Sequence, residues 1–214
     1  MTRPTGILGG TFDPVHHGHL RMAIECYERI ELEEIRLVPL LAPPHRQHPV
    51  ASPEHRLAML KIAVDDLQGM VIDDCELQRN EVSYTIDTVS KLRQTLGNTP
   101  LCLLMGTDAF NTLHTWHRWQ ELLEQTHIVI AQRHSNRFKP EAAELIDIFS
   151  KHLTEDISVL HETPAGRIFE IHIPFLDISA TQIRVAFRGK KNPAFLLPEG
   201  VIDYINSNHI YQTG

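Results

Sequence analysis

The stretch GILGGTFDPVHHGHL, residues 6–20, decides how the rest of the chain is interpreted. The apolar run over residues 5–8 predicts a buried strand, and Gly9 and Gly10 predict a tight turn at its end. Apolar residues recur at helical spacing over residues 18–31, which predicts a helix. A strand, a glycine turn and a helix start can be an ordinary connection, or they can form a phosphate site. The rest of the sequence distinguishes the two.

Strands and helices alternate through most of the remaining chain. Apolar runs predict strands over residues 34–40, 70–73, 101–106, 127–133 and 167–173. Helical spacing and capping signals predict helices over residues 53–67, 83–97, 116–125, 139–152, 179–189 and 197–209. This alternation predicts an α/β fold, with a doubly wound, mostly parallel sheet in a three-layer α/β/α arrangement. In such sheets, ligands bind beyond the carboxyl ends of the strands, where the strand order reverses.

The chain shows no repeat and no convincing linker. Residues 1–214 are therefore expected to form one domain, with a small helical part at about residues 179–214. The formal net charge of -7 disfavours a nucleic-acid-binding protein, which usually carries a basic face. Three widely spaced cysteines indicate a reducing compartment, and no stretch indicates a signal peptide or a membrane span. We expect a cytoplasmic protein that binds neither nucleic acid nor a membrane.

The glycines and histidines of the opening stretch suit a phosphate ligand. Gly9 and Gly10 allow backbone N–H groups to approach phosphate oxygens, and the following helix N-terminus attracts anions. His16 and His19 lie three residues apart, so they share one helix face and can donate hydrogen bonds to phosphates. Gly18 leaves space between them for a nucleotide. The alternatives are incidental histidines beside a turn, or a metal site, which lacks an obvious third ligand.

A second stretch with the same chemistry is DISATQIR, residues 177–184. Ser179 can cap a helix N-terminus and Thr181 lies in its first turn. Together with free backbone N–H groups, these hydroxyls can hold a phosphate. Arg184, one turn further on, adds a guanidinium that matches phosphate geometry. Taken alone, this stretch is also compatible with an ordinary capped amphipathic helix.

Two further stretches suit an anionic small molecule. PPHR presents His45 and Arg46 as cations on a loop whose geometry a pair of prolines fixes. SYT places Tyr84 and Thr85 at a helix start, where free N–H groups and the threonine hydroxyl face outward. Each stretch alone is more often a plain loop or a helix cap.

Aromatic and acidic residues complete the candidate set. In TWHRW, residues 115–119, we expect Trp116 to stack on a flat ring and Trp119 to anchor the core. GTDAF follows the most apolar strand, and its Asp108 can accept hydrogen bonds from ribose hydroxyls. Arg133 ends the next strand, at the same edge of the sheet.

Taken in order, GGTFDPVHHGH, PPHR, SYT, GTD, TWHRW, QR and ISATQIR resemble the motifs of bacterial nicotinate-nucleotide adenylyltransferases. HHGH, residues 16–19, resembles the HxGH signature of the nucleotidylyltransferase superfamily, and ISATQIR resembles its ISxTxxR element. SYT and TWHRW narrow the match to the pyridine-nucleotide branch. The resemblance covers nearly the whole chain, from Gly6 to the last predicted helix. It implies a Rossmann-like nucleotidyltransferase fold and adenylyl transfer from ATP to nicotinate mononucleotide. The products would be nicotinate adenine dinucleotide and pyrophosphate, in NAD biosynthesis.

The resemblance also implies a role for each candidate residue. The catalytic residues would be His16, His19 and Arg184. The ATP-binding residues would be Gly9, Gly10, Thr11, Phe12, Gly18, Gly106, Asp108, Arg133, Ser179 and Thr181. The mononucleotide-binding residues would be His45, Arg46, Tyr84, Thr85 and Trp116. Mg²⁺ would assist together with ATP, with no protein side chain expected as its ligand. Leu40 stands where many relatives have Asn, which changes the contacts of that loop but not the reaction.

Other functions are open from the residues alone. The nearest is an adenylyltransferase of the same fold that acts on nicotinamide mononucleotide or another phosphate acceptor, such as a phosphopantetheine. A histidine-rich metal hydrolase is a different class, and a non-catalytic nucleotide-sensing module is a third. The presence of His16, Gly18, His19 and Arg184 together argues against the non-catalytic module. Both a monomer and a homo-oligomer fit the sequence.

Overall fold

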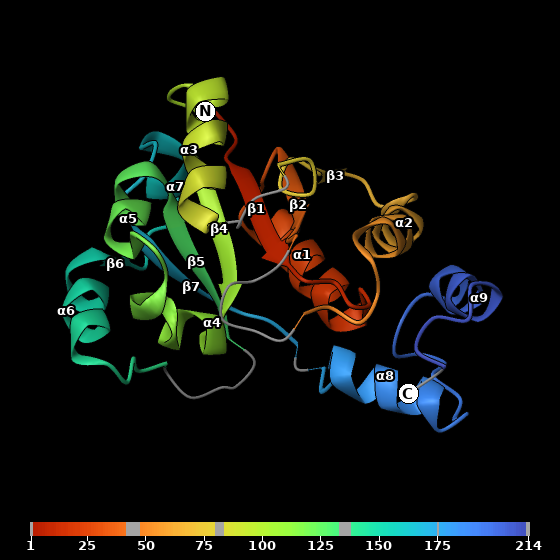
Figure 1. The fold of residues 1–214 in the computed structure, drawn as a ribbon. Coiled ribbons are helices and arrows are strands. Elements are labelled where there is room, and N and C mark those ends of the chain that lie inside the picture. Colours follow the sequence, from red (N-terminus) through yellow and green to blue (C-terminus); the bar gives the residue numbers. More distant parts are fainter. Residues whose placement is uncertain (1, 42–47, 80–83, 133–137, 175, 213–214) are drawn as a thin grey trace.

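The computed structural model describes residues 2–41, 48–79, 84–132, 138–174 and 176–212. Within these residues, seven strands form one sheet with helices on both faces (Figure 1). The strands are β1 (Thr5–Gly10), β2 (Glu34–Pro39), β3 (Met70–Ile72), β4 (Leu101–Gly106), β5 (His127–Gln132), β6 (Leu153–Thr154) and β7 (Ile168–His172). Their order is β3-β2-β1-β4-β5-β7-β6, and each neighbouring pair is parallel. The predicted doubly wound α/β fold is confirmed.

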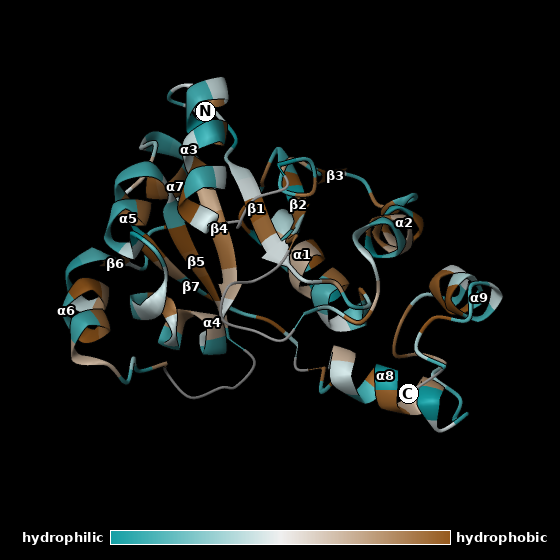
Figure 2. Ribbon diagram, in the orientation of Figure 1, coloured by the Kyte–Doolittle hydropathy of each residue, from teal (hydrophilic) through white to brown (hydrophobic). Residues whose placement is uncertain are grey.

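The helices pack in two layers around the sheet. They are α1 (His17–Arg29), α2 (Pro53–Val64), α3 (Thr85–Leu96), α4 (Thr107–Asn111), α5 (Leu122–Gln125), α6 (Ala143–His152), α7 (Val159–Glu162), α8 (Ala180–Arg188) and α9 (Glu199–Ser207), with 3₁₀ turns η1 (Leu113–Thr115) and η2 (Trp119–Glu121). Strand side chains alternate between two apolar clusters: Leu8 and Leu104 face one layer, and Ile7 and Leu103 face the other. Helices α1, α2, α7, α8 and α9 contribute to the first cluster, and α3 to α6 contribute to the second. Figure 2 shows the hydrophobic strands between helices that carry hydrophilic stretches.

The exit from β1 differs from the sequence prediction. Gly9 and Gly10 belong to the strand and pair with Val38 and Pro39 of β2, so the tight turn predicted there is wrong. The chain leaves the sheet through Phe12, whose backbone is left-handed with φ of 49°. An ideal Cβ atom on Gly10 would lie 2.8 Å from the Phe12 ring. The glycine is therefore needed because the ring folds back against the strand.

The helix predicted over residues 116–125 is also wrong, because that segment is broken. It contains η2 followed directly by α5, and Arg118 before them adopts a left-handed conformation with φ of 50°. The sequence analysis also missed α4, β6 and α7, which have five, two and four residues. Elements this short depend on tertiary contacts more than on their own propensity.

The strand order reverses between β1 and β4, where the two halves of the sheet meet. A ligand crevice is expected at the carboxyl ends of these strands. Helices α8 and α9 enter the apolar cluster of α1 and α2 through Ile183, Phe187 and Val201. Among the described residues, no helix is both long enough and apolar enough to cross a bilayer. The cytoplasmic location stays a prediction from the sequence.

Candidate active site

The carboxyl ends of β1 and β4 form the open part of the sheet. Their register ends at Ile7 and Leu103, whereas the strands continue to Gly10 and Gly106. An ideal Cβ atom on Gly106 would meet no atom of the described residues within 4 Å. No described side chain therefore fills the position beside Gly106, as the crevice expected from the strand order requires.

Two histidines stand at this opening. His16 is the N-cap residue of α1, with no capping hydrogen bond from its side chain, and His19 lies in the first turn. Their imidazole rings stack with centroids 3.8 Å apart and planes inclined by 27°. The carbonyl oxygen of His16 accepts the amide N–H of His19 at 2.9 Å. The ring of Phe12 meets the His19 ring edge-on at 5.1 Å. The prediction that both histidines share one face of the helix is confirmed.

Gly18 provides the space that the His16 ring occupies. A Cβ atom at this position would lie 3.0 Å from two atoms of that ring and 3.5 Å from the Ile178 carbonyl oxygen. The segment before α8 therefore packs directly against the start of α1. His17, which was not expected to take part in the site, is held by the C-terminal part, where its amide donates to the Leu196 carbonyl at 3.0 Å.

Arg184 connects α8 to the loop between β1 and α1. Its Nη1 donates to the Asp13 carbonyl oxygen at 2.8 Å, across a sequence separation of 171 residues. Its Nη2 donates to Oγ1 of Thr181 at 3.1 Å. Ser179 caps α8, since its Oγ accepts the amide N–H of Gln182 at 3.2 Å. The two predicted phosphate elements are therefore in contact.

The first turns of α1 and α8 carry no acidic residue. Every other α-helix of the described residues has one there, namely Glu54, Asp87, Asp108, Glu124, Glu144, Glu162 and Glu199. Acidic side chains favour helix N-termini because they complement the helix dipole. Their absence from two adjoining helix starts leaves both starts able to attract an external anion. This pattern is expected of a polyphosphate site.

Thr11, Phe12 and Asp108, which are also predicted to bind ATP, lie at or just beyond the ends of β1 and β4. Thr11 directly follows β1, and its carbonyl oxygen accepts a hydrogen bond from Arg56 at 2.7 Å. Phe12 is buried and contacts His19, so its side chain would support the site through packing. Asp108 is exposed in the first turn of α4, which begins where β4 ends.

The start of α3 contacts the TWHRW segment. Tyr84 is the N-cap of α3, and its ring centroid lies 4.3 Å from that of His117, a residue that the sequence analysis missed. Thr85 begins the helix and directly follows Tyr84, so it lies near the TWHRW segment. Both Trp116 and Trp119 are partly buried against the second apolar cluster. Because both side chains are partly buried, burial does not test the prediction that Trp116 binds a ligand ring and Trp119 anchors the core.

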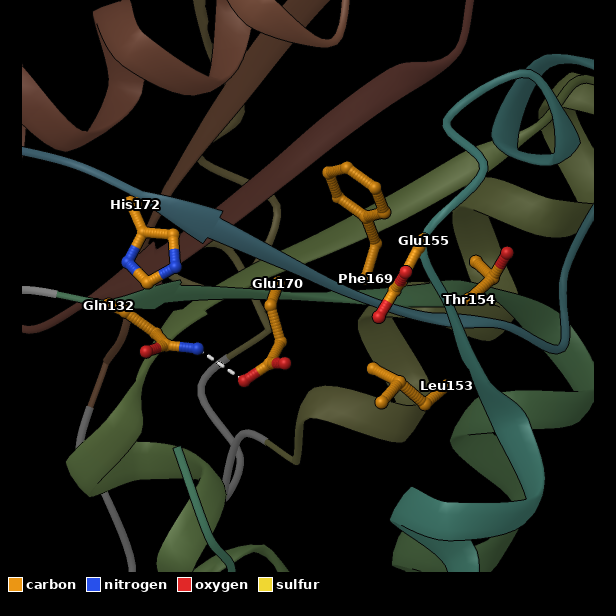
Figure 3. A pocket seen from close by; sticks show the side chains of 7 residues that line it. All are labelled: Gln132, Leu153, Thr154, Glu155, Phe169, Glu170 and His172. Carbon is orange, nitrogen blue, oxygen red and sulfur yellow. Dashed lines mark hydrogen bonds between the residues drawn. The ribbon is translucent and has the colours of Figure 1, made fainter. Parts of the chain in front are cut away.

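His45, Arg46 and Arg133 lie outside the described residues. Gln132, which precedes Arg133, is buried and donates to the Glu170 carboxylate, tying β5 to β7 (Figure 3). A cavity of about 390 Å³ opens at this edge, lined by Gln132, Leu153, Thr154, Glu155, Phe169, Glu170 and His172. The cavity lies over β5, β7 and β6, and β4 stands between these strands and β1, so the cavity is distinct from the opening at the histidines.

Arg56 is a buried support that the sequence analysis missed. Its guanidinium donates to three carbonyl oxygens, those of Thr11 at 2.7 Å, Leu40 at 2.7 Å and Leu41 at 3.1 Å. These carbonyls follow β1 and β2, so the side chain joins the two loops that leave the sheet beside the opening. A signal was present, because Met59 and Leu60 place Arg56 on the apolar face of its helix.

Asp13 is the second residue that the sequence analysis missed. It lies between β1 and His16, and it is 5% exposed. The signal was an acidic residue inside a loop predicted to bind anions, where an outward-facing carboxylate would repel the ligand. The burial shows that this carboxylate turns away from the solvent.

The donor set at the opening matches an anion better than a metal ion. Within the described part of the chain, no three His, Cys, Asp or Glu side chains lie together as a possible metal site. The groups that meet there are two imidazoles, a guanidinium and two helix N-termini. All of them can donate hydrogen bonds to phosphate oxygens.

Comparison with known proteins identifies the family. The cytidylyltransferase-like family matches residues 7–186. A relative from Aeromonas salmonicida is 43% identical over 99% of this chain and 99% of its own length, and one from Pseudomonas fluorescens is 44% identical with the same coverage. Both carry the name "Probable nicotinate-nucleotide adenylyltransferase".

Solved structures show the same fold. Nicotinic acid mononucleotide adenylyltransferase of Plasmodium falciparum, complexed with NaAD, superposes with a TM-score of 0.76. The two chains are 17% identical, and the match covers 99% of this chain and 98% of the other. The chain therefore belongs to the cytidylyltransferase-like family and, within it, to the nicotinate-nucleotide adenylyltransferases.

Proposed function

We propose that this chain transfers the adenylyl group of ATP to nicotinate mononucleotide. The products are nicotinate adenine dinucleotide and pyrophosphate. The observation that carries the proposal is the contact between two helix starts without acidic residues, made through Gly18 and Ile178 and through Arg184 and Asp13. A triphosphate is the part of the two substrates that needs two such anion sites side by side.

The ATP side of the site combines both helix starts. His16 and His19 hold phosphate oxygens from α1, while Ser179, Thr181 and Arg184 hold them from α8. The further ATP contacts come from Gly9, Gly10, Thr11, Phe12, Gly18, Gly106, Asp108 and Arg133. Asp108 is exposed at the end of β4, which supports a contact with the ribose hydroxyls.

The mononucleotide occupies the side of α3. Tyr84 and Thr85 meet the nicotinate carboxylate, partly through backbone N–H groups at the helix start. Trp116 stacks on the pyridine ring. The ring contact between Tyr84 and His117 supports this placement, because it joins the two segments. His45 and Arg46 are proposed for the mononucleotide phosphate from their sequence motif.

The transfer needs no base and no covalent enzyme intermediate. The acceptor phosphate is already an anion, and one of its oxygens attacks the α-phosphorus of ATP. The bond from that phosphorus to the bridging oxygen breaks in line, and pyrophosphate leaves with the electron pair. Alignment of two bound reactants can supply about 7–11 kcal/mol of barrier lowering. The histidines and Arg184 stabilise the charge on the transferred group and on the leaving group.

Mg²⁺ enters as the companion of ATP in this proposal. The described residues offer phosphate donors at the opening but no set of three metal ligands. Mg²⁺ commonly binds through substrate phosphates with few protein ligands, so the residues present fit an ion that the triphosphate carries. When bound, the ion neutralises phosphate charge, while the histidines and Arg184 position the oxygens.

We further propose that residues 1–214 act as one domain. Helices α8 and α9 share an apolar cluster with α1 and α2, which supports a C-terminal helical part at about residues 179–214 that completes the ATP site. The proposal applies to a monomer and to a homo-oligomer alike.

A pyrophosphate-release assay tests the proposed function. The chain is given ATP, Mg²⁺ and either nicotinate or nicotinamide mononucleotide, and the dinucleotide product is identified by mass spectrometry. We expect rapid release with the nicotinate compound and slow release with the nicotinamide compound. Release only with nicotinamide mononucleotide or a phosphopantetheine would reassign the acceptor. Ester hydrolysis by zinc-loaded enzyme without ATP would instead indicate a metal hydrolase.

A further inference from the structure

The Asp13 carboxylate is the point where four segments of the chain meet. Its Oδ1 accepts the amide N–H of Ala51 at 3.0 Å and the hydroxyl of Tyr211 at 2.7 Å. Its Oδ2 accepts the amide N–H of Val50 at 2.8 Å and lies 3.7 Å from Nη1 of Arg184. The same Arg184 nitrogen holds the Asp13 backbone. The position of this side chain therefore sets where the loop before His16 lies relative to α8.

Tyr211 reaches this carboxylate from 198 residues away, near the end of the chain. The side chain is 3% exposed, and its ring centroid lies 6.2 Å from that of Phe187 on α8. Its backbone is left-handed, with φ of 62°, a conformation that tyrosine adopts rarely. The buried ring and the hydrogen bond to Asp13 therefore hold the C-terminal segment in a conformation that it would not adopt by itself.

The hydroxyl of Tyr211 stays protonated as the donor to Asp13. Burial raises the pKa of this phenol, and the Asp13 charge raises it further. Asp13 also lies within electrostatic reach of Arg56, the residue that joins the loops after β1 and β2. Removing the hydroxyl would leave Oδ1 with the Ala51 amide alone and would free the carboxylate to turn toward either arginine.

We propose that Tyr211 is a positioning residue for adenylyl transfer. Its hydroxyl acts through Asp13 to hold the loop before His16 and the Arg184 guanidinium in the arrangement that receives the phosphates of ATP. This inference rests on the proposed function, since it assigns the phosphates to these two elements. Tyr211 itself makes no contact with the substrate. Its influence falls on the ATP side, because Asp13 touches both phosphate elements and, among the described residues, none of those assigned to the mononucleotide.

The test replaces Tyr211 with phenylalanine, which keeps the ring and removes the hydroxyl. The matched control is Tyr204→Phe, because the Tyr204 hydroxyl hydrogen-bonds to Nδ1 of His55 at 3.0 Å, away from Asp13. Binding of α,β-methylene-ATP is measured by calorimetry, and KM for each substrate is measured by pyrophosphate release. We expect Tyr211→Phe to weaken analogue binding and raise KM for ATP about tenfold, the scale of one lost hydrogen bond to a charged group.

Tyr204→Phe should leave both KM values within about twofold of those of the unmodified protein, because the Tyr204 hydroxyl bonds to His55 and not to Asp13. In Tyr211→Phe, KM for nicotinate mononucleotide should also stay within about twofold, because Asp13 makes no hydrogen bond or ion pair with the described residues that are assigned to the mononucleotide. Partial unfolding would lower the number of binding sites without changing the affinity of those left. That result, or an unchanged affinity in a fully folded variant, overturns the proposal. Absence of pyrophosphate release by the unmodified protein would overturn the proposed function instead, and analogue binding would still decide the role of Tyr211.

Discussion

The imidazole ring of His16 lies on that of His19 with centroids 3.8 Å apart, and Gly18 leaves the space for this stack. The stack places two imidazoles side by side at the start of α1. Arg184 approaches the same loop from α8.

His19→Ala is expected to lower kcat about a hundredfold or more, since one donor to a developing charge is typically worth about 2.7–4 kcal/mol. The fold should survive, because His19 is half-buried and its helix is fixed by other residues. His17→Ala is the control, since the His17 backbone and ring contact the C-terminal part instead. The kcat values of both variants are measured by steady-state kinetics. A near-normal kcat for His19→Ala would show that His19 does not stabilise the phosphate charge.

Gly18→Ala is expected to lower kcat about tenfold while leaving the melting temperature unchanged or slightly raised. The added Cβ would lie 3.0 Å from the His16 ring, so the ring must move by a few tenths of an ångström. Gly200→Ala is a matched control, because Gly200 is also the second residue of its helix and its Cβ would meet only the Ile62 side chain. Equal activities of the two variants would show that the His16 position is not critical.

Trp116→Ala is expected to raise KM for nicotinate mononucleotide about tenfold or more, the scale of one lost stacking contact. KM for ATP should hardly change. Trp119→Ala is the comparison, because both tryptophans pack against the same apolar cluster. Trp119→Ala should lower the melting temperature without a selective effect on either KM. An equal increase of KM for nicotinate mononucleotide and for ATP in Trp116→Ala would mean that the Trp116 indole has a structural role only.

The layers of the fold could be predicted because apolar residues repeat with strand and helix periods. The sheet order could not, because neighbouring strands such as β1 and β4 are joined by contacts far apart in the sequence. The exit of β1 was mispredicted for a local reason. Two consecutive glycines generally indicate a turn. Here Gly10 stays in the strand, and its missing side chain leaves space for the ring of Phe12, two residues further along the chain.

In the candidate site too, some residues could be predicted from the sequence and others could not. His16, His19 and Arg184 follow from motif spacing, and the structure brings their segments into contact. Tyr211 had no local signal, since only the folded chain places its hydroxyl 2.7 Å from Asp13. Arg56 did have one, because it precedes the apolar residues Met59 and Leu60 by three and four positions and so shares their face of the helix. The roles of buried polar residues such as Tyr211 and Arg56 can be identified only from the hydrogen bonds that they make in the folded chain.

The stability of the protein is expected to fall as the pH drops below about 6.5, partly because of His127. Burial lowers the pKa of this imidazole, and the charges of Arg93 and Arg167 lower it further. Nδ1 accepts the Arg167 amide at 3.1 Å and Nε2 contacts the Thr163 carbonyl at 2.8 Å, so the neutral ring already uses both nitrogens. The unfolded chain therefore binds a proton at a higher pH than the folded chain.

Urea unfolding at about pH 7.5 and about pH 5.5 measures this contribution. His127→Asn should have a lower free energy of unfolding than the unmodified protein at both pH values. The decrease in this free energy from about pH 7.5 to about pH 5.5 should be smaller in the variant than in the unmodified protein. His172→Gln, which changes an exposed side chain, should keep the original dependence. If the free energy of unfolding of His127→Asn depends on pH as strongly as that of the unmodified protein, groups other than His127 cause the pH dependence.

Arg56→Met is expected to lower the free energy of unfolding by about 3–5 kcal/mol, since it removes a fully buried guanidinium that donates to three backbone carbonyls. The carbonyl oxygens of Thr11, Leu40 and Leu41 lose their guanidinium donor, and each orphaned acceptor costs about 1–3 kcal/mol. Arg36→Met is the control, because Arg36 is partly exposed and pairs with Glu34 and Asp73 near the surface. It should cost about 1 kcal/mol or less.

Arg56→Lys separates the charge of this residue from its shape. An ammonium keeps the charge, but it lacks the planar fork that reaches carbonyls on two loops at once. We expect the lysine variant to recover less than half of the stability lost in Arg56→Met, and to bind ATP more weakly because Thr11 is no longer held beside the end of β1. Chemical denaturation and ATP titration measure the two effects. Full recovery by lysine would show that the charge near Asp13, and not the hydrogen bonds to the two loops, is what the fold requires.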